Sequence, residues 1–204
     1  MRIHPPFSGL DRYCRMTVLN QSVLKAGELL YEIKVELKEI EPPIWRIIQV
    51  PSRTSLLRLH RILQRAMGWK DYHLHLFEVD GKRYGEPSTE WDIEVLESRK
   101  MTLEKVFSGG RTSFLYEYDL GDSWVHELTL LSASQGEEKL GCTAGARACP
   151  PEDCGGPMGY YELLVALSDP SHEEHLAMLE WVGGKFDPNA FSVTAADQAL
   201  KRLR

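Results

Sequence analysis

Apolar runs are short throughout this sequence. None approaches the roughly 18 consecutive apolar residues that a bilayer-spanning helix needs. The first residues also lack the charged, apolar and small-residue order of a secretory signal peptide. Apolar residues make up 43% of the chain and charged residues 26%, which is ordinary for a globular protein. We therefore expect a globular protein that works in the cytoplasm and has no membrane partner.

Several common catalytic motifs are missing as well. The sequence contains no G-x4-G-K-[ST] phosphate loop, no G-x-G-x-x-G, no H-E-x-x-H and no G-x-S-x-G. His172 and His175 enclose two glutamates, but a zincin motif places its histidines four residues apart, whereas these are three apart. These absences argue against nucleotide-binding, zincin and serine-hydrolase chemistry.

Cysteine is scarce, and its placement is uneven. The sequence has four cysteines, and Cys142, Cys149 and Cys154 fall within thirteen residues. In a reducing compartment such a cluster predicts metal ligands or buried small residues before disulfides. Structural zinc takes four tetrahedral nitrogen or sulfur ligands. We predict His126 as the fourth ligand, with His73 or His75 as substitutes. The alternative is that the thiols are inert and the neighbouring Pro and Gly residues shape a turn.

Acidic residues are absent from residues 42–70, although the net charge of the chain is −6. Residues 1–110 carry 17 Lys/Arg and 15 Asp/Glu, whereas residues 111–204 carry 7 and 15. Arg58, Arg61 and Arg65 fall on one face of a predicted helix. That face predicts contact with an acidic protein or with nucleic-acid phosphates. The alternative is a solvated face that pairs with the acidic half of the same chain.

Residues 1–28 show no sustained period, so we predict a poorly ordered tail, with Met16 as an alternative initiator. Residues 29–204 are predicted to form a single α+β domain. Apolar and polar residues alternate over residues 31–37, which predicts a strand, and residues 44–50 supply the return strand. A helix is predicted from the capping residues 52–55 to Met67, closed by Gly68.

Later segments predict further hairpins. Asp80-Gly81 favours a type I′ turn between strands at residues 73–79 and 82–84. A second hairpin is predicted from residues 113–118 and 124–130, followed by a loop over residues 135–159 and three helices. Two of these helices are predicted to start with capping boxes, Ser171 with Glu174 and Thr194 with Asp197. The order predicts a β-grasp-like mixed sheet with one crossing helix and a helical C-terminal part.

The second hairpin also brings titratable side chains together. Asp119 and Asp122 flank its turn, and His126 follows on the strand. These three residues form a candidate acid–base or metal-binding cluster. The alternative is that the aspartates cap the turn with their own side chains and His126 is a partly buried structural histidine.

Three segments carry a resemblance to a known family. They are His73–Phe77, Tyr118–His126 (YDLGDSWVH) and Arg147–Gly156 (RACPPEDCGG), the last followed by Gly159-Tyr160. With Phe186-Asp187-Pro188 they make the sequence from Tyr31 onward resemble the plasmid pRiA4b ORF-3-like family. The resemblance implies an α+β fold and frequent association with plasmids and insertion elements. Some relatives bear the label TnpR resolvase, but the resemblance brings no assigned catalytic residues.

Three functions remain open at the level of sequence. A serine recombinase is disfavoured, because no helix-turn-helix pattern is present and only seven basic residues follow residue 110. The leading hypothesis is a non-catalytic binding or accessory module of a mobile element that contacts its partner through Arg58, Arg61 and Arg65. The second is a metal-dependent, hydrolase-like enzyme that uses Asp119, Asp122 and His126. The third is a purely structural zinc domain.

Overall fold

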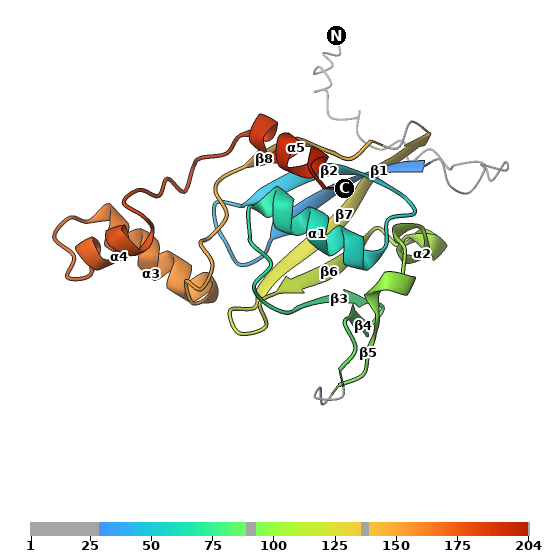
Figure 1. Cartoon of the computed structure of the whole chain (residues 1–204), viewed down its shortest axis with the longest axis horizontal. Helices are drawn as coiled ribbons and strands as arrows, with labels where there is room; N and C mark the ends of the chain where they lie inside the picture. Colours follow the sequence, from blue (N-terminus) through green and yellow to red (C-terminus); the bar gives the residue numbers. More distant parts are fainter. Residues whose placement is uncertain (1–28, 89–92, 136–138, 204) are drawn as a thin grey trace, which may run out of the picture.

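One mixed β-sheet forms the centre of the molecule (Figure 1). The computed structural model describes residues 29–88, 93–135 and 139–203, so the predicted tail at residues 1–28 lies outside it. The sheet has the strand order β5-β4-β3-β6-β7-β1-β2-β8. The strands are β1 (Leu29–Leu37), β2 (Trp45–Pro51), β3 (His75–Val79), β4 (Lys82–Gly85), β5 (Val95–Glu97), β6 (Ser113–Tyr118), β7 (Trp124–Gln135) and β8 (Gly141–Ala146). Neighbours are antiparallel, except that β5 runs parallel to β4.

Strand β1 lies inside the sheet between β2 and β7. Its alternation puts Ile33 and Val35 fully into the core, while the alternating Glu32, Lys34 and Glu36 lie on the other face. The hairpin of β3 and β4 turns at Asp80 and Gly81, whose φ angles of 52° and 69° match the type I′ turn predicted from sequence.

Helix α1 (Leu56–Met67) crosses one face of the sheet (Figure 1). Ser55 caps it, since its hydroxyl accepts a hydrogen bond from the backbone N–H of Arg58. Gly68 ends it with a left-handed φ of 98°. The helix buries an apolar stripe of Leu56, Leu59, Leu63 and Ala66 and, in addition, two polar side chains, His60 and Gln64.

The sheet and helices confirm the predicted α+β fold with its crossing helix and helical C-terminal part. The segment over residues 135–159 differs from the predicted loop, because it contains the end of β7, all of β8 and the start of α3. Strand β8 reads GCTAGA, a composition with little strand propensity. Backbone pairing with β2 stabilises it at the sheet edge, a contribution that local sequence does not reveal.

The remaining helices are α2 (Leu103–Val106), α3 (Gly156–Ser168), α4 (His175–Trp181) and α5 (Val193–Lys201), with short 3₁₀ turns at Ser98–Lys100 and Ser108–Gly110. Neither predicted capping box forms. Ser192 caps α5 through the N–H of Ala195, and the Ser171 hydroxyl donates to Asp169 instead of capping α4. The longest described helix, α3, has 13 residues, so no described helix can span a membrane.

Candidate metal centre

His73 lies in the segment between α1 and β3, and not on the strand where the sequence pattern had placed it. The chain reaches this position through Asp71, which has a left-handed φ of 63°. The backbone N–H of Tyr72 donates to the hydroxyl of Tyr118, 3.1 Å away. This bond fixes the segment against the end of β6 and directs His73 toward the turn between β6 and β7.

Asp119 occupies that turn in a left-handed conformation, with φ 56°. One of its carboxylate oxygens, Oδ1, accepts hydrogen bonds from the N–H groups of Gly121 and Asp122, at 3.0 and 3.3 Å. The aspartate therefore caps the turn, as one of the two sequence interpretations held. Its other oxygen, Oδ2, takes no part in the cap and faces His73.

A third segment, residues 147–155, is held against these two by buried contacts. The guanidinium of Arg46 is buried and donates to the carbonyl of Arg147, 2.9 Å away, and to the carbonyl of Ala66 in α1, 3.0 Å away. The indole N–H of Trp69 donates to the carbonyl of Pro150, 3.0 Å away. These bonds fasten the loop to the end of α1 and place Glu152 and Asp153 beside His73.

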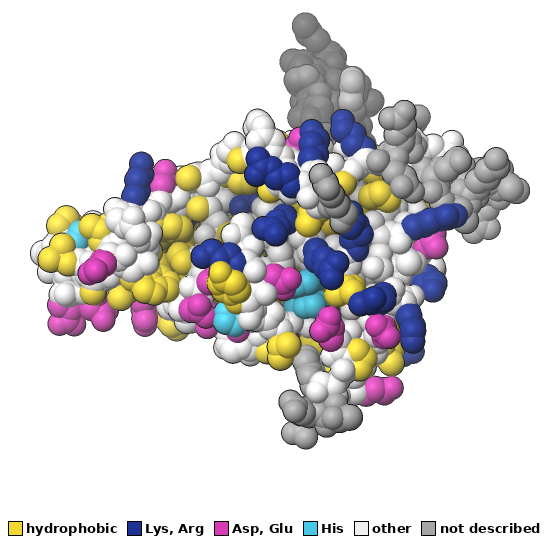
Figure 2. Space-filling model, in the orientation of Figure 1, with side chains coloured by type: hydrophobic (Ala, Val, Ile, Leu, Met, Phe, Trp, Pro, Cys, Tyr) yellow, Lys and Arg dark blue, Asp and Glu magenta, His cyan; other side chains and the backbone are white. Residues whose placement is uncertain are grey.

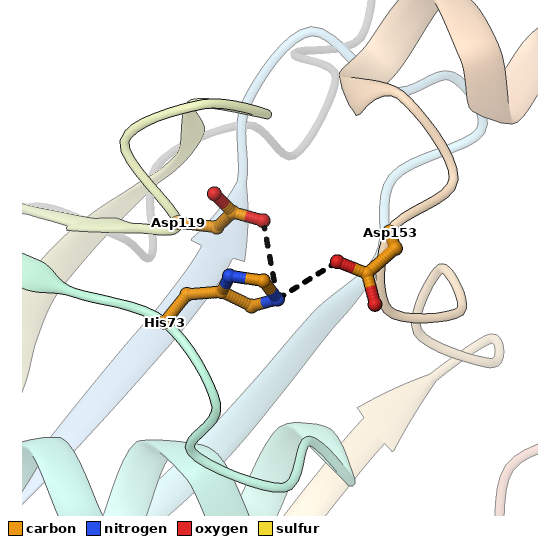
Figure 3. Close-up of side chains that lie close together, drawn as sticks. All are labelled: His73, Asp119 and Asp153. Atoms are coloured by element: carbon orange, nitrogen blue, oxygen red, sulfur yellow. Dashed lines mark ion pairs between the residues drawn. The ribbon is translucent and has the colours of Figure 1, made fainter.

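The three segments bring one imidazole among three carboxylates. His73 Nε2 lies 2.9 Å from Asp153 Oδ1, 3.6 Å from Asp119 Oδ2 and 3.8 Å from Glu152 Oε2. Figure 3 shows the ring nitrogen between the carboxylates of Asp119 and Asp153. The nitrogen is sealed from solvent and makes no hydrogen bond of acceptable angle to any described residue, although Asp153 Oδ1 is within bonding distance.

These distances suit a metal ion. Single ligand atoms of His73, Asp119 and Asp153 all lie within 4.8 Å of one another, which in the described part of the chain holds for no other group of three His, Cys, Asp or Glu. Two ligands of a tetrahedral zinc ion stand about 3.4 Å apart, at about 2.1 Å from the ion. This is close to the 3.6 and 2.9 Å that separate His73 Nε2 from Asp119 and Asp153. The Asp119 and Glu152 side chains are only 12% and 13% exposed, so their negative charges need a counter-ion that one histidine does not fully provide.

A cavity of about 450 Å³ adjoins the centre and shares His73 with it. Its wall includes His60, Arg61, Asp71 and His75. The rings of His60 and His75 stack with centroids 3.5 Å apart. Burial lowers the pKa of His75 to about 3, so this ring is neutral at physiological pH. Its Nε2 is buried and has no hydrogen-bond partner among the described residues.

A closed ring of hydrogen bonds supports the cavity wall. His60 Nε2–H donates to Asp71, because a carboxylate only accepts, and His60 Nδ1 therefore accepts from the hydroxyl of Tyr116, at 2.7 and 2.8 Å. The Gln64 amide donates to that hydroxyl and accepts from the backbone N–H of Asp71. Burial lowers the pKa of His60 despite the opposing effect of Asp71, in keeping with this neutral tautomer.

His126 does not join Asp119 and Asp122 in the cluster predicted from sequence. It is completely buried, its Nδ1 lies 2.9 Å from the carbonyl of Trp124, and its ring packs edge-on against Trp69. Burial lowers its pKa to about 4. Asp122 instead accepts a hydrogen bond from the N–H of Gly155, 3.1 Å away, which connects the turn to the loop of residues 147–155.

The predicted zinc ligands are also not gathered into one group within the described residues. Cys142 lies in β8, where its thiol donates to the carbonyl of Ala144. Burial raises the pKa of Cys149, and it raises that of Cys154 to about 12. Both thiols are therefore protonated at neutral pH unless a metal ion displaces the proton.

The predicted arginine face is present on α1. Arg61 and Arg65 are exposed, and neither forms an ion pair with any residue that the structure describes. Arg58 is half-buried, and its guanidinium donates to the carbonyl of Leu203, 3.4 Å away. Figure 2 shows basic side chains on the same side of the molecule as histidine and acidic side chains.

Comparison with known proteins now places the chain. A model of the plasmid pRiA4b ORF-3-like protein family matches residues 29–195. This chain belongs to that family. The uncharacterized protein y4hQ of Sinorhizobium fredii is 38% identical over 175 residues, which cover 84% of this chain and 90% of that protein. The crystal structure of a protein of unknown function, MM3350 from Methanosarcina mazei Go1, has 38% sequence identity and a TM-score of 0.74, and the match covers 82% of this chain and 97% of that one.

Each segment that carries the pRiA4b ORF-3-like resemblance supplies one residue of the centre. His73 begins the first segment, Asp119 lies in the second and Asp153 in the third. Sequence reasoning proposed Asp119 but missed Glu152 and Asp153, and it gave His73 only a secondary place. One feature of the sequence pointed to the centre. Each of the three motifs contains a titratable residue, which is the pattern expected when separate segments form one site.

Proposed function

We propose that this pRiA4b ORF-3-like protein binds one divalent metal ion through His73, Asp119 and Asp153 and uses it for hydrolysis. The observation that carries the proposal is the buried Nε2 of His73, which faces three carboxylates without a hydrogen bond. One imidazole and several carboxylates make a mixed nitrogen and oxygen ligand set that suits Zn²⁺ or Mn²⁺. The centre thus replaces the sequence hypothesis that used Asp119, Asp122 and His126.

The residues around the centre support hydrolytic chemistry. A bound divalent ion supplies Lewis acidity and lowers the pKa of a water molecule on it. Glu152 is held in place by the hydroxyl of Tyr118, 3.1 Å from Oε2, and by the N–H of Lys70, 2.7 Å from Oε1. It is therefore positioned as a further ligand or as a general base. The cavity that His73 lines lies next to the centre and offers space for a substrate beside it.

Metal titration by calorimetry tests the proposed centre. We expect wild-type protein to bind about one Mn²⁺ or Zn²⁺ per chain, and His73→Ala and Asp153→Asn to bind at least about tenfold more weakly, since each loses a ligand. His172→Ala, which removes an imidazole outside the centre, is the matched control and should bind like wild type. Equal affinity in wild type and His73→Ala would remove the site.

A cysteine variant separates this centre from a structural zinc site. Elemental analysis of Cys149→Ser/Cys154→Ser should show an unchanged metal content if the ion sits at His73, whereas loss of zinc would favour the structural zinc domain. Hydrolysis is measured with p-nitrophenyl acetate and bis(p-nitrophenyl) phosphate, with and without metal. Metal binding without hydrolysis of either compound would contradict the catalytic part of the proposal.

A second candidate is the non-catalytic binding or accessory module of a mobile element, which contacts an acidic protein or nucleic acid through Arg58, Arg61 and Arg65. Its support is the exposure of Arg61 and Arg65 without ion pairs to the described residues. Exposed arginines on one helix face suit phosphate contacts. Salt-dependent binding of single-stranded DNA tests this candidate.

A further inference from the structure

Helices α3 and α4 form a lobe that projects beyond the edge of the sheet (Figure 1). Large apolar side chains are exposed on it, including Met158 (72%), Val165 (57%), Leu176 (77%) and Trp181 (47%). Figure 2 shows apolar side chains gathered over this lobe, with acidic side chains along its lower edge. Exposed apolar surface of this kind, rimmed by charges, marks an interaction site more often than a plain solvent face.

The charge of the lobe has one sign. Residues 148–184 contain seven Asp and Glu and no Lys or Arg. The apolar surface is therefore combined with negative potential, and a partner that covers it must bring positive charge. Nucleic acid and anionic membranes are disfavoured here, because both would meet like charge.

A groove of about 350 Å³ lies between the two helices. Buried Leu163 and Ala166 of α3 contribute to its wall, together with Met178 and the exposed indole of Trp181. The groove is also lined by Glu162, Glu174 and Asp153, whereas no lysine or arginine of the described residues lines it. An apolar wall accommodates an aliphatic side chain, and carboxylates beside an aromatic ring suit a cation.

We propose that this groove docks a basic amphipathic peptide segment of a partner protein. An aliphatic side chain of the segment packs on Leu163 and Met178, and a neighbouring lysine or arginine pairs with Glu162 or Glu174 beside Trp181. This surface is separate from the proposed metal centre, apart from Asp153, which belongs to both. A second copy of this chain is a poorer occupant, because a twofold contact through the lobe would set acids against acids.

Fluorescence anisotropy with two labelled 16-residue peptides tests the docking surface. One peptide carries Leu and Lys at amphipathic helical spacing, and the other carries Glu in place of every Lys. We expect the lysine peptide to bind and the glutamate peptide not to bind. Glu162→Gln/Glu174→Gln and, separately, Trp181→Ala should each weaken binding about tenfold, since central charged and aromatic contacts dominate such interfaces.

Glu173→Gln is the matched control, because Glu173 is exposed next to Glu174 and does not line the groove. It should leave the affinity unchanged. Unchanged affinity in Glu162→Gln/Glu174→Gln would overturn the proposal, as would similar binding of both peptides. Sedimentation that shows a dimer at micromolar concentration, abolished by Trp181→Ala, would assign the surface to a second copy instead. All of these variants retain His73, Asp119 and Asp153, so metal titration on them reports separately on the proposed function.

Discussion

Three histidines are buried where α1 packs on the sheet: His60 on the helix, His75 on β3 and His126 on β7. A buried imidazole is stable mainly in its neutral form, because burial removes the hydration that the charged ring needs. The ring of hydrogen bonds through His60, Gln64, Asp71 and Tyr116 satisfies both nitrogens of His60. The Nε2 atoms of His75 and His126 have no hydrogen-bond partner among the described residues. The sequence predicted helix α1 and its caps but not this network, because the partners in the network come from different elements.

We predict that His126 makes the folded state sensitive to acid. Its folded-state pKa of about 4 lies below the value near 6.5 expected in the unfolded chain. Above pH 6.5 both states are neutral and the contribution vanishes. As the pH falls from 6.5 to 4, only the unfolded state binds the proton, so the free energy of unfolding decreases by up to about 1.4 kcal/mol per pH unit.

Urea unfolding of wild type and His126→Gln between pH 7 and pH 4.5 measures this effect. Glutamine keeps an N–H for the Trp124 carbonyl but does not titrate. The comparison uses the slope of the free energy of unfolding against pH for each protein. A constant loss of stability in the variant therefore does not affect it. Identical slopes would show that His126 is not the responsible group.

The loop of residues 147–155 contacts the turn between β6 and β7 at Gly155 and Gly156, where α3 begins. Both have left-handed φ angles, 87° and 69°, and a Cβ on Gly156 would lie only 2.5 Å from the carbonyl oxygen of Asp122. Gly156 thus allows the loop of residues 147–155 to pack directly against the turn that carries Asp119. This close contact sets the separation between Asp119 and Asp153 in the proposed centre.

We predict that Gly156→Ala disturbs the centre as well as the fold. The methyl group should push the loop away from the turn, weaken metal binding about tenfold and lower the free energy of unfolding by about 1–3 kcal/mol. Gly109→Ala is the control, since Gly109 has a similar φ of 75° but no atom within 4 Å of its Cβ position. Metal affinity that falls equally in both variants would contradict the steric explanation.

The elements predicted well from sequence are those that depend on neighbouring residues. Alternation in β1, the caps of α1 and the Asp80-Gly81 turn each act over a few positions. The proposed centre depends on three segments that meet only after the sheet has formed. The sequence placed His126 on the strand that follows the turn, but it could not show that the side chain points into the buried core. The proposed centre could therefore be predicted only in part from the sequence.

Across the whole molecule, positive charge collects on α1 and negative charge on the lobe of α3 and α4 (Figure 2). Among the described residues, neither Arg61 nor Arg65 forms an ion pair with an acidic side chain of the lobe. The expected self-pairing of the arginine face with the acidic half is thus absent for these two side chains. Each charged surface is left available to a different kind of partner.

We predict that Arg61→Ala/Arg65→Ala weakens binding of a single-stranded 12-nucleotide DNA, if α1 contacts phosphates. Loss of two phosphate contacts should reduce the slope of log affinity against log salt concentration by about 1.4, at about 0.7 for each contact. Arg99→Ala/Lys100→Ala removes the same charge elsewhere and should keep the wild-type slope. Absence of any DNA binding at 50 mM salt would remove the nucleic-acid candidate.

The separation of His73, Asp119 and Asp153 along the sequence has a consequence for synthesis of the protein. A ribosome releases the first two residues well before the third, so a nascent chain has no complete centre until Asp153 has emerged. An ion held there would join the early and late parts of the chain. Metal loading would then coincide with completion of the fold, and a truncated product would remain empty and open to proteolysis.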